Sequence, residues 1–159
     1  MLSIHHIENT YQKLDAVREL FSEYADELGE DLTFQHFDEE LNDPLKKYGP
    51  PNGSLLIAYW YNEPAGCIAL QPLEQGLCEM KRLYVRPQYR EHGIGDYLIK
   101  KLVHEGYKKG YKKMVLDTLQ RLKEAIRLYE MNGFESVSAY YENPLPEVVF
   151  MEKELLEVD

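Results

Sequence analysis

The sequence has few cysteines and no long apolar segment. Its two cysteines, Cys67 and Cys78, are too few for the disulfide framework of a small secreted domain. Both lie in apolar, strand-like segments, so we predict buried free thiols rather than a catalytic role. No segment approaches the ~18 apolar residues of a membrane helix. The first six residues, MLSIHH, also lack the basic and apolar regions of a signal peptide. We therefore expect a cytoplasmic protein that does not act at a membrane.

Basic residues are scarce, because 18 Lys and Arg stand against 28 Asp and Glu and give a net charge of −10. This balance argues against a nucleic-acid partner or an anionic membrane surface. The charges are also segregated: residues 1–50 hold 12 acids and 4 Lys/Arg, whereas residues 81–113 hold 3 acids and 10 Lys/Arg. The basic segment indicates a specific anionic ligand, and the acidic segment leaves room for a cationic one. Most lysines between 100 and 113 are better explained as the solvated face of a helix.

The length of 159 residues is enough for one domain that buries a core, and we expect residues 1–159 to form it. The histidines do not show the spacing of metal ligands, so we expect no metal site.

Hydrophobic periodicity predicts about four helices and seven strands. The predicted helices span residues 10–28, 33–41, 95–110 and 119–132. The predicted strands span residues 2–8, 54–61, 65–70, 77–85, 113–118, 136–141 and 148–151. Pro44 is expected to follow the end of the second helix, and Asp117 or Thr118 to cap the fourth. This order predicts an α+β fold in which helices cover both faces of a mixed sheet.

The segment YREHGIGDYL, residues 89–98, places two glycines between a strand and a helix. A helix N-terminus offers unpaired N–H groups and the positive end of the helix dipole, so the glycines let an anion approach closely. A dinucleotide-binding motif would need Gly or Ala at Leu98, and the G-K-[ST] of a Walker loop is missing. Taken alone, R-x-x-G-x-G is a weak signal, since it also fits a simple tight turn.

Two separated segments resemble the GCN5-related N-acetyltransferase (GNAT) superfamily. CEMKRLYVRPQYREHGIGDYLIKKLV, residues 78–103, is similar to the family's central strand, pyrophosphate loop and helix. AIRLYEMNGF, residues 125–134, is similar to its second signature, and YYENPLPEVVFMEKEL, residues 140–155, to the closing hairpin of a broad bacterial subgroup. The resemblance implies a GNAT-like fold with a splayed parallel strand pair, formed by residues 77–85 and 113–118.

The resemblance also implies an acetyl-CoA site in this gap. The backbone of Leu83, Tyr84 and Val85 would pair with the pantetheine arm. The pyrophosphate would be wrapped by the loop residues Arg90, Glu91, His92, Gly93, Ile94 and Gly95.

The implied reaction is direct attack of an amine on the thioester, with an oxyanion held by the backbone N–H near Val85. Tyr129 occupies the family position of the general acid that protonates the leaving thiolate. The alternative is that Tyr129 only packs on the apolar stripe of its helix.

The sequence departs from the family pattern at two positions. Leu122 replaces an Asn that contacts the cofactor in many relatives. Cys78 occupies the position at which some relatives carry a Glu that acts as the general base. Glu79 is a weak candidate for the base, because strand alternation turns it to the other face unless a bulge shifts the register. Water is the alternative proton acceptor.

The acceptor site is expected around DLTFQHFDEEL and YYENPLPE, with Gln35, Asp38 and Glu39 as candidate contacts for a cationic amine. The alternative is a solvated acidic helix face. The sequence therefore predicts an acetyl-CoA-dependent N-acetyltransferase whose acceptor is a small-molecule amine. A protein N-terminus or lysine acceptor, or a catalytically silent acyl-CoA-binding module, remains the alternative. A homodimer is compatible with the sequence.

Overall fold

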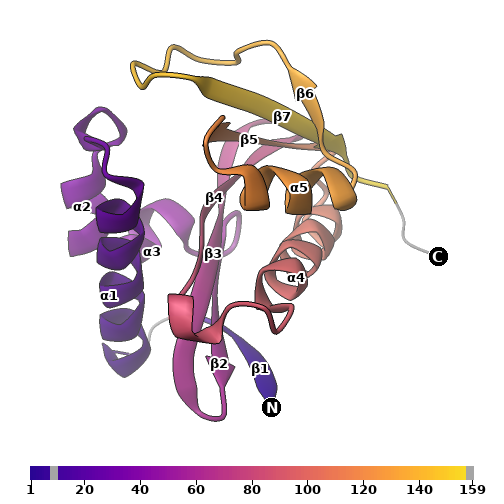
Figure 1. Cartoon of the computed structure of the whole chain (residues 1–159). Helices are drawn as coiled ribbons and strands as arrows, with labels where there is room; N and C mark the ends of the chain where they lie inside the picture. Colours follow the sequence, from indigo (N-terminus) through magenta and orange to yellow (C-terminus); the bar gives the residue numbers. More distant parts are fainter. Residues whose placement is uncertain (8–10, 157–159) are drawn as a thin grey trace.

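A computed structural model describes residues 1–7 and 11–156 of the chain (Figure 1). The predicted strand end at Glu8 and helix start at Thr10 lie outside the described residues. The sheet has seven strands in the order β1-β2-β3-β4-β5-β7-β6. The strands are β1 Leu2–His6, β2 Ser54–Trp60, β3 Glu63–Glu74, β4 Leu77–Val85, β5 Lys113–Leu119, β6 Glu135–Val137 and β7 Val148–Glu154. The helices are α1 Tyr11–Leu28, α2 Phe37–Asn42, α3 Pro44–Tyr48, α4 Ile94–Lys108 and α5 Lys123–Met131. The predicted α+β class is confirmed.

The two faces of the sheet carry separate cores. On one face, α4 and α5 pack through apolar residues at helical spacing, among them Ile94, Leu98 and Leu102. On the other face, α1 packs through Val17 and Phe21, with α2 and α3 beside it (Figure 1). Burial of these apolar stripes fixes which side of the sheet each helix covers.

Both cysteines lie inside these cores. Cys67 and Cys78 are buried free thiols, as predicted. None of the described helices has the length and apolar character needed to cross a membrane.

β4 and β5 form the parallel pair, and they separate after three residue pairs. Leu77 to Glu79 face Lys113 to Val115 in register. Beyond Glu79, β4 continues to Val85 paired with β3, and β5 continues to Leu119 paired with β7. The predicted splayed pair is confirmed, and it opens a gap in the middle of the sheet.

A β-bulge in β4 sets which side chains face this gap. Lys81 pairs with Ala69 and Tyr84 with Cys67, so Arg82 and Leu83 together oppose a single residue of β3. Arg82 adopts a left-handed backbone with φ of 61°. The extra residue places Lys81 and Arg82 on the same face, toward α2, and Glu79, two residues before Lys81, shares that face.

Several element boundaries differ from those predicted, and three of these differences affect the site. Pro44 was expected only to follow the end of the second helix. It also begins an additional helix, α3, because proline fits the first helical position. Asp117 and Thr118 belong to β5, whose pairing with β7 runs to Leu119, so neither caps α5. β6 ends at Val137, and the chain after it turns toward α2 rather than continuing as a strand.

Candidate functional site

A small cavity lies where β4 and β5 separate. It has a volume of about 60 Å³ and receives side chains from both strands, from α1 and from α5. Its lining consists of Tyr24, Met80, Lys81, Arg82, Leu83, Asp117, Thr118, Leu122, Ala125 and Tyr129. The splay thus brings the expected general acid, Tyr129, to the strand segment expected to bind the acyl donor.

Tyr129 is held in place by packing from α5. Its side chain is 7% exposed, and its ring meets Phe134 edge to face with centroids 6.0 Å apart. Burial raises the pKa of the Tyr129 hydroxyl, and the nearby Tyr24 and Asp117 add to this. The hydroxyl therefore stays protonated at neutral pH, which is the state a proton donor requires.

The bulge residue Arg82 forms a buried ion pair that ties β4 to α2. Its Nε and Nη2 donate to the two oxygens of Glu40 at 2.7 and 3.0 Å. Glu40 also accepts from the Tyr48 hydroxyl at 2.8 Å. The guanidinium lies over the rings of Tyr24 and Phe37. These bidentate hydrogen bonds and stacking contacts of the guanidinium stabilise the left-handed backbone conformation of Arg82.

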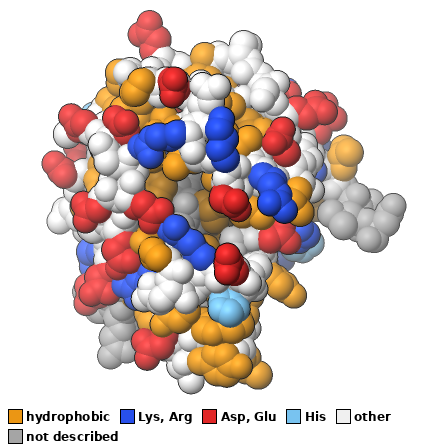
Figure 2. Space-filling view, in the orientation of Figure 1, with side chains coloured by type: hydrophobic (Ala, Val, Ile, Leu, Met, Phe, Trp, Pro, Cys, Tyr) orange, Lys and Arg blue, Asp and Glu red, His pale blue; other side chains and the backbone are white. Residues whose placement is uncertain are grey.

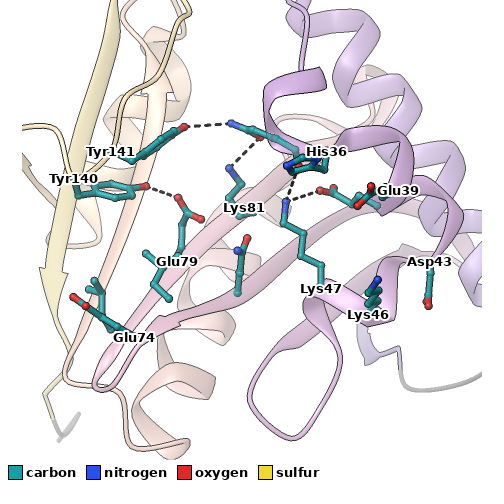
Figure 3. A pocket seen from close by; sticks show the side chains of 15 residues that line it. His36, Glu39, Asp43, Lys46, Lys47, Glu74, Glu79, Lys81, Tyr140 and Tyr141 are labelled. Atoms are coloured by element: carbon teal, nitrogen blue, oxygen red, sulfur yellow. Dashed lines mark hydrogen bonds and ion pairs between the residues drawn. The ribbon is translucent and has the colours of Figure 1, made fainter.

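A second, larger cavity opens on the α2 side of the sheet (Figure 3). Its volume is about 710 Å³. It is walled by α2, α3, the β3–β4 hairpin and the segment at residues 140–141. Lys81 lines both cavities, so the two adjoin at its side chain.

Lys81 is a buried lysine at the junction of the two cavities. Its Nζ donates to Gln35 Oε1 at 3.1 Å and lies 3.9 Å from the carboxylate of Asp117. Burial lowers the pKa of Lys81, although the negative charges of Glu79 and Asp117 oppose this effect. The sequence analysis missed Lys81 and Asp117 as site residues; charged residues inside apolar strands were the available signal.

Two tyrosines after β6 close the cavity by binding carboxylates on the sheet. The Tyr140 hydroxyl donates to Glu79 Oε2 at 2.5 Å (Figure 3). The Tyr141 hydroxyl donates to Asp117. Asn143 Nδ2 also donates to Asp117, at 2.7 Å. These contacts come from the tail segment that the sequence marked for the acceptor site.

The glycine loop precedes α4 with two left-handed residues, Glu91 at φ 70° and Gly93 at φ 77°. Gly93 is the N-cap of α4, and a Cβ placed there would meet nothing within 4 Å. Gly95 differs, because its Cβ would lie 3.3 Å from Leu128 of α5. Gly93 thus leaves space at the helix N-terminus, whereas Gly95 allows helix packing.

Two other loop side chains, Arg90 and His92, have partners within the protein. Arg90 donates to Val85 O at 2.9 Å and to Glu27 at 2.7 and 2.8 Å. The His92 ring stacks on Trp60 with centroids 4.6 Å apart.

The remaining predicted residues fall into two groups. Leu83 and Val85 pack toward the α4 core, while the Tyr84 hydroxyl reaches Glu23 of α1. Gln35 and Glu39 line the large cavity, and Asp38 is exposed outside its lining. The surface view shows basic and acidic side chains around the central hollow of the molecule (Figure 2).

Residues 14–134 match the model of the acetyltransferase (GNAT) family. The chain is 48% identical over 146 residues to an uncharacterised N-acetyltransferase of Schizosaccharomyces pombe, covering 91% of this chain and 90% of that protein. It is 30% identical to an uncharacterised N-acetyltransferase of Dictyostelium discoideum, with coverage of 87% and 92%. A crystal structure of a Streptococcus agalactiae acetyltransferase superposes with a TM-score of 0.80 at 21% identity, covering 97% of this chain and 98% of that one.

Proposed function

The chain belongs to the acetyltransferase (GNAT) family and is an acetyl-transferring enzyme, and from this premise we propose that it moves an acetyl group from acetyl-CoA to a primary amine of a small molecule. The observation that carries this proposal is the meeting of three features at one point. The strands splay there, Tyr129 lines the small cavity in the gap, and the large cavity adjoins the small one at Lys81.

The glycine loop and the end of β4 would hold the donor. The first turn of α4 presents free N–H groups beside the space at Gly93, which suits a diphosphate. The family implies that the loop residues from Arg90 to Gly95 surround this group. In that arrangement Arg90 would exchange Glu27 for the diphosphate. The main chain of Leu83, Tyr84 and Val85 follows the bulge at the open edge of β4, where the pantetheine arm could pair as an added strand.

The transfer would proceed by direct attack. The amine nitrogen forms a bond to the thioester carbonyl carbon while the carbon–sulfur bond breaks. The carbonyl oxygen gains negative charge, which the main-chain N–H near Val85 would stabilise. The leaving sulfur takes the proton of the Tyr129 hydroxyl, and solvent restores that proton.

Glu79 is less suited to act as the base. Its side chain lines the large cavity, but Glu79 does not line the small cavity where the strands separate. The amine proton would therefore leave through water in the large cavity, and Glu79 would contact the acceptor without taking its proton. Gln35 and Glu39 lie on the same cavity wall, with Asp38 further out.

Release of free thiol from acetyl-CoA tests this function. We expect thiol release that depends on enzyme and on an amine drawn from a panel of small primary amines, with acetylated amine as the second product. Binding of acetyl-CoA without thiol release on any amine, including peptide N-termini and lysine, would indicate a catalytically silent acyl-CoA-binding module instead.

A further inference from the structure

The large cavity contains carboxylates that lack a cationic partner within the described part of the chain. Glu79 is 5% exposed, and one of its oxygens accepts from Tyr140. Among the described residues, no Lys, Arg or His nitrogen lies within 4.0 Å of the Glu79 carboxylate. A buried carboxylate in this position is costly unless a cation joins it.

A second unused acceptor lies beside Glu79. Gln71 is its directly paired neighbour on β3, so their Cβ atoms are about 5 Å apart on the same face of the sheet. Gln71 Oε1 is out of contact with solvent and has no hydrogen-bond partner among the described residues. Both side chains line the large cavity. Together they present hydrogen-bond acceptors, which fit a ligand that donates N–H groups.

The lysines of the cavity do not fill this role. Lys47 donates to Glu40 and to Gln35 O, both at 3.2 Å. Lys81 donates to Gln35 and faces Asp117. Lys46 lies exposed at the rim. Among the described residues, most basic side chains of the cavity therefore already have a partner, whereas the side chains without an ion-pair partner are mainly acidic. The carboxylates of Glu39, Asp43 and Glu74 also line this cavity.

We propose that Glu79 and Gln71 bind a second nitrogen cation of the acceptor, so that the acceptor is a short-chain diamine. The inference rests on the proposed function, because the reacting amine must lie at the splay near Lys81. Glu79 precedes Lys81 by two strand residues, roughly 7 Å. The cavity thus offers one place for the reacting nitrogen and another for a distal cationic nitrogen.

Binding of small probes by calorimetry tests this pocket without requiring turnover. The probes are 1,4-diaminobutane, butylamine and 4-aminobutanoate, which share a chain length and differ in the distal group. Diamines from 1,3-diaminopropane to 1,6-diaminohexane, each with its monoamine, extend the series. We expect at least one diamine to bind at least tenfold more tightly than its monoamine, the scale of one charge-assisted hydrogen bond.

Substitutions then locate the distal group. Glu79→Gln should reduce the diamine preference to less than twofold. Gln71→Leu should reduce it in part, and Gln71→Glu should increase it. Asp26→Asn, an exposed carboxylate on α1 outside the cavity, is the matched control and should leave the preference unchanged. A cooperative urea transition confirms that each variant is folded, and the two Gln71 variants keep the test decisive if Glu79→Gln fails to fold.

Equal binding of diamines and monoamines across the series would overturn the inference. Tighter binding of 4-aminobutanoate would also overturn it, because the cavity lysines would then recognise a carboxylate. Thiol release with monoamines would still support the proposed function in either case, so the two failures are distinguishable.

Discussion

At the residue scale, burial decides the chemistry of Tyr129. Helical spacing places this tyrosine on the packed stripe of α5, and the packing against Phe134 is observed. The same burial raises the pKa of the hydroxyl, so one side chain combines a structural ring with a proton that is retained at neutral pH. The two interpretations of Tyr129 left open by the sequence are therefore compatible.

Replacing Tyr129 with Phe separates the two roles. Tyr129→Phe keeps the packed ring and removes the hydroxyl, so we expect kcat to fall by ~10²-fold if the hydroxyl protonates the thiolate. The affinity for acetyl-CoA, measured by calorimetry, should hardly change. Tyr111→Phe is the control, because its hydroxyl binds Asn52 O away from both cavities. A kcat of Tyr129→Phe within twofold of wild type, with chemistry rate-limiting, would remove Tyr129 from the mechanism.

Other site residues could be recognised only from the three-dimensional structure. Lys81 and Asp117 are separated by the whole of α4 in sequence, and only the parallel pairing of β4 with β5 brings them to 3.9 Å. The position of Arg82 likewise depends on the β-bulge, which sets Arg82 on the same face as Lys81 and which no local pattern in residues 80–85 predicts. Strand alternation does place Glu79 on the face opposite Cys78, but which of the two faces borders the large cavity is decided by the packing of α2 and the tail segment.

At the element scale, strongly periodic helices and strands were predictable, whereas short elements were not. α1 and α4 have amphipathic stripes that packing preserves. α3 has five residues and begins at a proline, so its pattern is too short to distinguish from a turn. The start of α5 was placed too early because pairing with β7 holds Asp117 and Thr118 in β5. Tertiary hydrogen bonds outweighed a local capping preference there.

The loop before α4 gives a matched pair of glycine substitutions. Gly93 and Gly110 both have positive φ, 77° and 91°, and a Cβ on either would meet nothing within 4 Å. Gly93→Ala and Gly110→Ala should each lower the free energy of unfolding by about 1 kcal/mol through backbone strain. Only Gly93→Ala should also weaken acetyl-CoA binding, by about tenfold or more, because its methyl group occupies the proposed diphosphate space.

Urea unfolding and calorimetry on both glycine variants provide the measurements. Equal acetyl-CoA affinity in the two variants would show that Gly93 serves the turn alone, and the proposed diphosphate position would then be withdrawn.

At the scale of the whole molecule, the acidic and basic halves of the chain pair with each other. Glu19 and Glu23, one helical turn apart on α1, bind Arg86. Glu27, one turn further, binds Arg90. Glu40 of α2 binds Arg82. The sequence analysis interpreted the segregated charge mainly in terms of ligands, but much of it fastens α1 and α2 to β4 and the glycine loop. A charge count alone cannot show which charges face each other.

Among these ion pairs, the buried pair Arg82–Glu40 is expected to contribute most to the free energy of unfolding. Burial raises the pKa of Glu40, but the hydrogen bonds and positive charge of Arg82 outweigh it and hold the pKa below its ordinary value of 4.5. Hydrogen bonding by Arg86 similarly lowers the pKa of Glu23. Because these folded-state pKa values are depressed, the stabilisation is complete above pH 4.5 and is lost as the pH falls further through them.

Substituting Glu40 tests whether this pair holds the site together. Glu40→Gln should lower the free energy of unfolding at pH 7 by about 3 kcal/mol, since it leaves the Arg82 charge buried and uncompensated. Its stability should then fall less than that of wild type between pH 6 and pH 3, because the titrating carboxylate is absent. Glu152→Gln breaks the exposed pair with Lys113 and should cost less than about 1 kcal/mol. Urea unfolding at both pH values supplies the free energies. Equal acid sensitivity in wild type and Glu40→Gln would mean that other carboxylates govern acid unfolding. The contact of Arg82 with residue 40 would then not depend on the charge of Glu40.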